Sequence, residues 1–121
     1  SLAFLQLQSE LQTLYGFELP DDRPLAFSVG EVVLKAGADG CWYATGAGPA
    51  HLPTAAVEVV DPVGAGDAFA GAYLAARLAG IDPRGAAWLG SQFAAGVVAA
   101  PGDTEGLPAP ERARALVASA A

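Results

Sequence analysis

Short runs of β-branched and apolar residues alternate with glycine-bounded turns over the middle of the chain. Such runs are typical of short, buried strands. A glycine at each end of residues 37–40 predicts a tight turn over residues 36–40. His51 and Pro53 are expected in a hairpin or loop. The strand candidates are residues 31–35 (EVVLK), 41–45 (CWYAT) and 56–60 (AVEVV).

The apolar spacing changes to a helical one after residue 66. Phe69, Tyr73 and Ala76 recur at i, i+4 and i+7, which predicts one buried face of a helix over residues 67–79 that ends at Gly80. Strands followed by helices, with a glycine-rich junction between them, indicate an α/β layered architecture. Further helices are expected over residues 7–15, from an Asp82 N-cap and Pro83 towards Ala100, and from Pro110 onward with Glu111 in its first turn.

The composition narrows the classes of function. The 121 residues are 53% hydrophobic and carry 13 acidic against 6 basic side chains, for a net charge of -7. We therefore expect neither nucleic acid nor a membrane as a partner, since both are bound by basic patches. A single cysteine excludes an internal disulfide and favours a reducing, cytoplasmic setting. The uncharged stretch between Arg84 and Asp103 is rich in alanine and glycine, which favours a buried helix over a membrane span.

Residues 59–74 (VVDPVGAGDAFAGAYL) are the segment with the clearest chemistry. The first turn of a helix has unpaired N–H groups with partial positive charge, and Gly64 and Gly66 leave room for a phosphate to approach them. Asp67 at this helix end is favoured in its charged form and can accept a proton. A carboxylate base beside an anion-binding turn fits phosphoryl transfer onto an alcohol. The alternative is a tight turn followed by an ordinary acidic first-turn residue.

Residues 61–74 resemble the C-terminal signature of the ribokinase-like (PfkB) sugar kinases, Asp-Thr-x-Gly-Ala-Gly-Asp followed by a helix. Residues 32–40 (VVLKAGADG) resemble the strand and Gly-x-x-Gly turn before that signature, and residues 91–108 (SQFAAGVVAAPGDTEGLP) resemble the helix and loop that wall the adenine site. DPVGAGDAF together with GDTEGLP is especially similar to the 2-keto-3-deoxygluconate kinases. The resemblance implies a three-layer α/β/α, Rossmann-like fold, of which residues 1–121 form the C-terminal, nucleotide-binding and catalytic portion.

The same resemblance implies site residues. Asp67 is the expected catalytic base, in contact with the sugar hydroxyl, and the backbone of Gly64, Ala65, Gly66 and Asp67 is the expected anion hole. Two alternatives stay open: a plain hairpin turn for the glycines of residues 37–40, and a solvated strand-end cation for the lysine before them. The expected nucleotide-binding residues are Lys35, Gly37, Ala38, Gly40, Ser91 and Gly102.

Several positions depart from the family pattern or allow two interpretations. Ser91 stands where these kinases often have Asn, and a plain helix-surface serine is the alternative. Gly102 follows a proline and is alternatively a simple helix stop. Asp61 helps to hold a monovalent cation or to orient its loop, and the alternative is a role in stabilising a turn only. Glu10 falls where an Asn-x-x-Glu element linked to magnesium would end, but Leu7 occupies the Asn position. No side chain is assigned as a metal ligand.

The expected activity is ATP-dependent phosphorylation of a sugar or sugar-acid hydroxyl, with 2-keto-3-deoxygluconate as the acceptor. ATP and Mg²⁺ are the expected cofactors, a monovalent cation is a further candidate, and the complete protein is expected to be a homo-oligomer. The family's sugar-recognising portion and lid have no counterpart in this sequence, so we expect a truncated chain that is inactive alone. The alternatives are a kinase for fructose, ribose or a nucleoside, and a non-catalytic nucleotide-binding or assembly fragment.

Overall fold

The computed structural model describes residues 30–45, 48–56 and 58–121. The chain divides into two compact units. One unit comprises Trp42–His51 and the chain up to Leu34, and the other comprises Lys35–Cys41 and Leu52–Ala121. The helix expected over residues 7–15, and Glu10 within it, lie outside the described residues. Every described residue assigned to the site belongs to the second unit.

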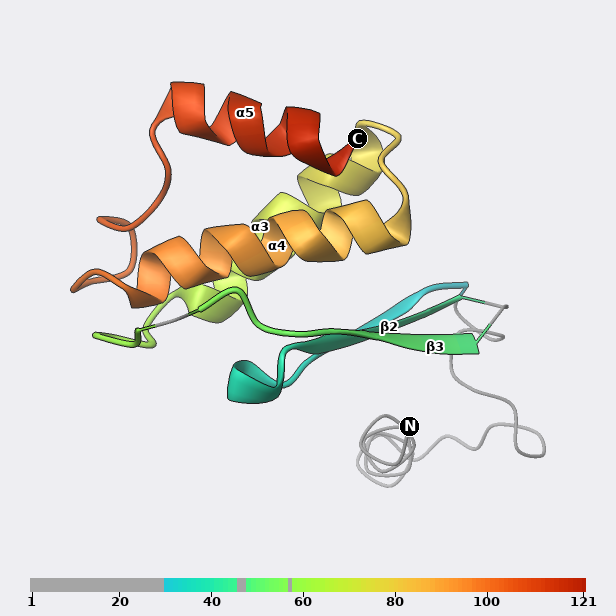
Figure 1. Ribbon diagram of the computed structural model, residues 1–121, viewed down its shortest axis with the longest axis horizontal. Helices are drawn as coiled ribbons and strands as arrows, with labels where there is room; N and C mark the ends of the chain where they lie inside the picture. The colour runs from blue at the N-terminus through green and yellow to red at the C-terminus, as the bar shows by residue number, and fades with distance from the viewer. Residues whose placement is uncertain (1–29, 46–47, 57) are drawn as a thin grey trace. The chain divides into compact units, whose positions relative to one another are not determined.

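Three short strands form a sheet in the order β1, β2, β3 (Figure 1). They are β1 (Val32–Lys35), β2 (Cys41–Thr45) and β3 (Gly48–Leu52). The connections are too short for a parallel crossover, so neighbouring strands run antiparallel. Between β1 and β2 the chain forms a 3₁₀ turn (Gly37–Asp39), closed by the Ala36 N–H donating to the Gly40 carbonyl oxygen at 2.8 Å. The strand, turn and strand predicted over residues 31–45 are thus confirmed.

The strand predicted over residues 56–60 is wrong. The hairpin that was one of two expectations around His51 is confirmed, since His51 lies in β3, which pairs with β2. The third strand is β3, which begins with Gly48 and Pro49 and includes His51. Gly and Pro are loop signals, but β3 is an edge strand, where the missing N–H of proline is tolerated. Val59 and Val60 are instead 63% and 55% exposed, and the Val60 N–H donates to the Val98 carbonyl oxygen at 2.6 Å rather than to a strand. β-branched composition indicated a strand here, but within residues 30–45, 48–56 and 58–121 no strand pairs with the segment.

Three helices follow the strands: α3 (Ala65–Leu78), α4 (Pro83–Val98) and α5 (Pro110–Ala120). Local signals set their ends. Gly80, with φ 86°, closes α3 as its N–H donates to the Arg77 carbonyl oxygen at 3.0 Å, and Asp82 caps α4 by accepting from the Gly85 N–H at 2.7 Å. The helix ends predicted at Gly80, Asp82 and Pro110 are therefore confirmed.

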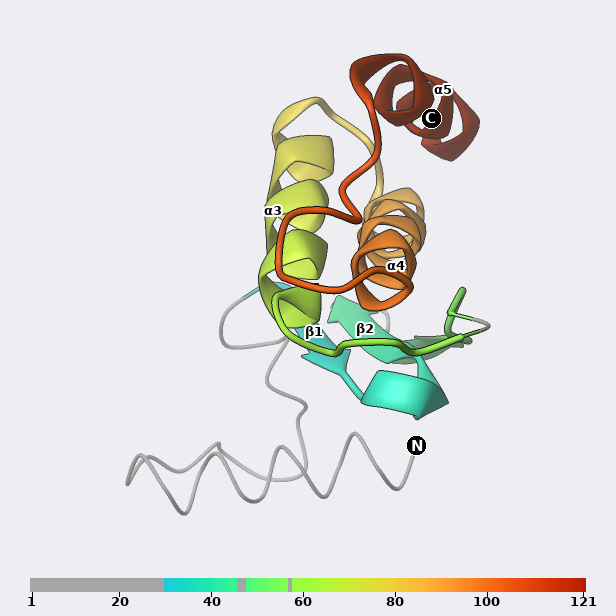
Figure 2. The ribbon, with the colours of Figure 1, turned by 90° about the vertical axis from the view of Figure 1, so that its left-hand side faces the viewer.

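Small residues let the helices pack closely. Helices α3 and α4 lie side by side, and α5 packs on α4 (Figure 2). A Cβ added to Gly90 of α4 would lie 3.0 Å from the carbonyl oxygen of Phe69 in α3, so the two backbones approach closely there. Phe69, Tyr73 and Ala76 are all buried, as predicted, and α4 has buried alanines in its first turns. Across residues 30–45, 48–56 and 58–121, none of the helices combines the length and the apolar character needed to cross a bilayer.

Candidate active site

The turn before α3 presents free backbone N–H groups at the helix N-terminus. Gly64 is the N-cap, in the left-handed conformation with φ 83°, and its carbonyl oxygen accepts from the Ala68 N–H at 2.9 Å. The Ala65 N–H donates to the Pro62 carbonyl oxygen at 3.3 Å. Within the described part of the chain, the N–H groups of Gly66 and Asp67 have no acceptor. Free N–H groups at the positive end of a fourteen-residue helix can bind an anion.

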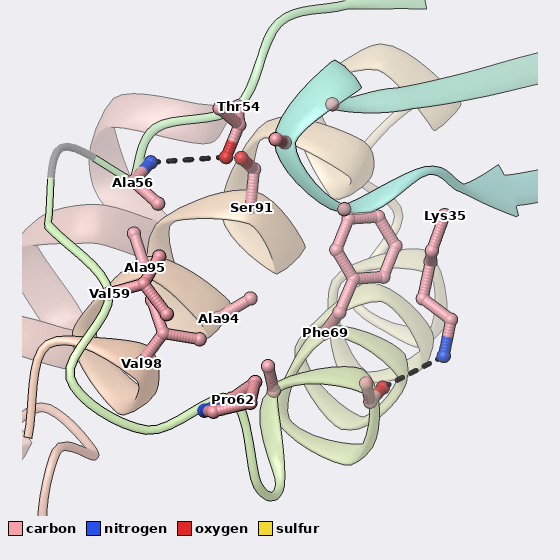
Figure 3. Close-up of a pocket in the computed structure, with 15 residues that line it drawn as sticks. Lys35, Thr54, Ala56, Val59, Pro62, Phe69, Ser91, Ala94, Ala95 and Val98 are labelled. Atoms are coloured by element: carbon pink, nitrogen blue, oxygen red, sulfur yellow. Dashed lines mark hydrogen bonds between the residues drawn. The ribbon is translucent and has the colours of Figure 1, made fainter. Parts of the chain in front are cut away.

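One side of this helix N-terminus faces a cavity of about 380 Å³, which we call the Lys35 cavity (Figure 3). Its wall includes five of the six residues predicted to bind nucleotide, together with two of the residues predicted to form the anion hole. Apolar side chains from α3 and α4, Phe69 and Val98 among them, form one part of its wall (Figure 3). The predicted residues that line it are Lys35, Gly37, Ala38, Gly40, Ser91, Ala65 and Gly66.

A second cavity, of about 410 Å³, lies on the Asp67 side and is called the Asp67 cavity below. Gly64 and the exposed Asp67 line it, and so do Asp103 and Thr104 from the loop after α4. Among the described residues that line this cavity, none is cationic. Gly66 therefore borders one cavity and Asp67 the other, and the free N–H groups of both residues lie at the same helix end.

Lys35 extends over the N-terminal turn of α3. Its Nζ donates to the Gly66 carbonyl oxygen at 3.1 Å (Figure 3), and a Cβ at Gly66 would lie 3.0 Å from Nζ. Lys35 is the chain's single lysine, and in the described part of the chain this carbonyl oxygen is its hydrogen-bond partner. A cation at the positive end of a helix is unfavourable unless an anion binds beside it. The Lys35 ammonium and the positive end of α3 are therefore both suited to bind an incoming phosphate.

Ser91 is buried, so the alternative interpretation as a plain serine on the helix surface is excluded. It is 9% exposed, and its Oγ accepts from the Ala55 N–H at 3.1 Å. Thr54 Oγ1 accepts from the Ala56 N–H at 3.1 Å (Figure 3). These two hydroxyls fix residues 54–56 along the rim of the Lys35 cavity. Sequence reasoning missed Thr54, for which the only signal was a Ser/Thr-type turn after a proline.

Asp61 forms the turn that was one of its predicted roles. Its Oδ1 accepts from the Val63 N–H at 3.0 Å and its Oδ2 accepts from the Gly102 N–H at 3.1 Å. The bond from Val63, and then the bond from Gly102, lower the pKa of Asp61 below its usual value. These contacts stabilise the fold at neutral pH and are lost as the pH falls through the lowered pKa. Gly102, predicted to bind nucleotide, donates its N–H to Asp61 and is not part of the Lys35 cavity wall; its contact with nucleotide stays a prediction.

Metal ligands are not gathered in the part of the chain that the structure describes. No group of three or more His, Cys, Asp or Glu side chains within residues 30–45, 48–56 and 58–121 could hold an ion. Any Mg²⁺ at this site would take most of its ligands from nucleotide phosphates and water, as Mg²⁺ commonly does. The two cavities and the α3 N-terminus are compatible with that arrangement.

The sequence model of the pfkB family carbohydrate kinases matches residues 8–110. The chain belongs to this family. A 2-dehydro-3-deoxygluconokinase from Thermoproteus tenax is 37% identical over 111 residues, which cover 89% of this chain and 34% of the relative. The chain thus spans about a third of the length of this curated pfkB relative.

Solved structures of pfkB-type kinases share the fold. Burkholderia thailandensis nucleoside kinase in complex with inosine superposes with a TM-score of 0.76 at 25% identity, over 95% of this chain and 37% of that one. An Escherichia coli ribokinase II with bound ATP and Mg²⁺ superposes with a TM-score of 0.64 at 32% identity, over 74% of this chain and 29% of that one. The predicted ribokinase-like α/β fold is confirmed for the part that this chain spans.

Proposed function

We propose that this chain is the nucleotide-binding and catalytic part of an ATP-dependent kinase that phosphorylates a sugar or sugar-acid hydroxyl. The observation that carries the proposal is the position of the free N–H groups of Gly66 and Asp67 between two cavities. The Lys35 cavity can take a nucleotide, and the Asp67 cavity can take an acceptor beside a carboxylate. Membership of a family of carbohydrate kinases supports this division.

In this proposal the base of ATP lies against the apolar wall of the Lys35 cavity, near Ser91 and Val98. The turn with Gly37 and Gly40 lets the nucleotide approach the backbone. The γ-phosphate then lies at the α3 N-terminus, where Lys35 and the N–H groups of Gly66 and Asp67 stabilise its charge. Mg²⁺ bound to the ATP phosphates neutralises further charge.

Transfer uses Asp67 as the general base. Its carboxylate accepts the proton of the acceptor hydroxyl as the hydroxyl oxygen forms a bond to the γ-phosphorus. The bond from that phosphorus to the bridging oxygen breaks, and ADP leaves. Gly64, Ala65, Gly66 and Asp67 supply the backbone of the anion hole during this step.

The proposed acceptor is 2-keto-3-deoxygluconate, because a 2-dehydro-3-deoxygluconokinase is among the curated relatives. A nucleoside is the second candidate, since the Burkholderia thailandensis nucleoside kinase that superposes well binds inosine. We assign the remaining acceptor contacts to polypeptide outside these 121 residues, because the relative is about three times as long. We also propose a monovalent cation and a homo-oligomer, which potassium titration of activity and light scattering would test.

The test is an assay of the complete polypeptide that contains this chain, with MgATP and a panel of acceptors. We expect phosphorylation of 2-keto-3-deoxygluconate, and we expect the 121 residues alone to bind ATP in calorimetry with little turnover. Transfer to inosine but not to the sugar acid would favour the second candidate. Nucleotide binding by the complete polypeptide without transfer to any acceptor would contradict the kinase proposal and support a binding fragment.

Lys35→Met is expected to weaken ATP binding about tenfold, because a charge-assisted contact to phosphate is lost. Adenosine, which has no phosphate, should bind within about twofold of its affinity for the unmodified chain. Calorimetry with both ligands makes the comparison. Arg84→Met removes the same charge from a position outside both cavity walls and is the matched control. Equal losses for ATP and adenosine would show that Lys35 acts on the fold and not on phosphate.

A further inference from the structure

Asp61 joins two segments of the chain that lie 41 positions apart. Its backbone N–H donates to the Val98 carbonyl oxygen at 3.1 Å, at the end of α4. Its Oδ2 accepts from the Gly102 N–H at 3.1 Å, at the start of the following loop. Its Oδ1 meanwhile accepts from the Val63 N–H at 3.0 Å, in the turn that leads into α3. One residue therefore ties the end of α4, the next loop and the turn before α3.

The loop that Asp61 binds is also a wall of the Asp67 cavity. Asp103 and Thr104 follow Gly102 directly, and both line that cavity. This loop is in close contact with the α3 N-cap, because a Cβ at Gly64 would lie 2.9 Å from the Asp103 carbonyl oxygen. Asp61 itself lines neither cavity. Its effect on a ligand must therefore pass through the loop.

We propose that Asp61 is a positioning residue, whose carboxylate holds residues 102–104 against the N-terminus of α3 and so sets the acceptor-side wall of the Asp67 cavity. The function of that cavity as an acceptor site rests on the proposed kinase activity. The contact rests on the structure alone. A displaced wall misplaces the acceptor hydroxyl relative to Asp67, and displacements of about 1 Å are known to reduce rates about a hundredfold.

Asp61→Asn separates the two contacts of the carboxylate. The amide has one acceptor oxygen and cannot accept from both N–H groups, and we expect that oxygen to keep the local turn to Val63, two residues away, and to lose Gly102. Asp82→Asn is the matched control, since it makes the same change of charge at a helix N-cap where Asn serves as well as Asp. Comparison of the two variants thus separates the effect of the hydrogen bond to Gly102 from the effect of losing one negative charge.

Amide hydrogen exchange on the 121-residue chain tests the contact without any need for activity. In Asp61→Asn we expect the Gly102 amide to exchange about tenfold faster and the Val63 amide to keep its rate, with both unchanged in Asp82→Asn. Unchanged exchange at Gly102 would overturn the proposal. If Asp61→Asn does not fold, NMR titration of the unmodified chain serves instead: the Gly102 amide signal should move with the Asp61 carboxyl carbon, and independent movement would overturn the proposal.

Kinetics of the complete polypeptide test the consequence. Asp61→Asn should raise the KM for the acceptor about tenfold to a hundredfold and leave the KM for ATP within about twofold. A fall in kcat with both KM values unchanged would indicate a loss of folded enzyme and would contradict a positioning role. A change confined to the potassium concentration for half-maximal activity would make Asp61 a cation ligand and would also contradict it. Failure of the complete polypeptide to transfer phosphate would refute the kinase activity and leave the exchange result standing.

Discussion

Asp67→Asn is expected to abolish phosphoryl transfer in the complete polypeptide while nucleotide affinity stays within about twofold of the unmodified value. Asn has nearly the same shape as Asp but cannot accept the hydroxyl proton. Removal of a general base lowers kcat by about 10² to 10⁴. Asp67 lines the Asp67 cavity and not the Lys35 cavity, so ATP should bind almost as before. Single-turnover transfer from labelled ATP, combined with calorimetry, measures both quantities.

Asp103→Asn is the informative comparison, because it removes the other carboxylate that lines the same cavity. If Asp67 is the base, Asp103→Asn should keep transfer within about tenfold, since the proton acceptor is still present. Two results would count against the assignment. One is an equally severe loss in Asp103→Asn, and the other is an Asp67→Asn enzyme that keeps more than a tenth of its transfer rate.

Local signals explain why most of the helical part could be predicted from sequence. Gly80 ends α3 through bonds to residues within the preceding turn, and Asp82 with Pro83 begins α4 through a bond three residues ahead. Both signals are complete within a few neighbouring residues. β3 was missed because its Gly48 and Pro49 favour a loop locally, while its pairing to β2 at the sheet edge is a tertiary property.

The candidate site divides in the same way. The anion-binding turn from Gly64 to Asp67 is contiguous in sequence, so its geometry at a helix N-terminus could be anticipated. The partners of Asp61 and Ser91 could not, because they are the N–H groups of Gly102 and Ala55, which lie 41 and 36 positions away. A backbone N–H is common to nearly every residue type and leaves no sequence signal. The sequence therefore carries no sign that the Gly102 N–H donates to Asp61.

Gly64→Ala is expected to be far more damaging than Gly80→Ala, although the two glycines have nearly the same backbone conformation. Their φ values are 83° and 86°, so both substitutions place an alanine in the left-handed region at a similar cost of about 1–2 kcal/mol. A Cβ at Gly80 meets nothing within 4 Å. A Cβ at Gly64 would lie 2.9 Å from both the Cβ and the carbonyl oxygen of Asp103. That overlap adds about 1–3 kcal/mol, because a backbone atom cannot move aside as a flexible side chain can.

Denaturant unfolding of the 121-residue chain measures the difference between these two variants, and we expect Gly64→Ala to lose at least about 1 kcal/mol more stability than Gly80→Ala. Equal losses would mean that the 102–104 loop does not press on the α3 N-cap. In the complete polypeptide, Gly64→Ala should also lower transfer about tenfold or more, whereas Gly80→Ala should not. Rotation of the N-cap redirects the N–H groups of Gly66 and Asp67, and relief of the overlap moves Asp103 away from the acceptor. A substitution of one hydrogen by a methyl group therefore disturbs the anion hole and the wall of the Asp67 cavity together.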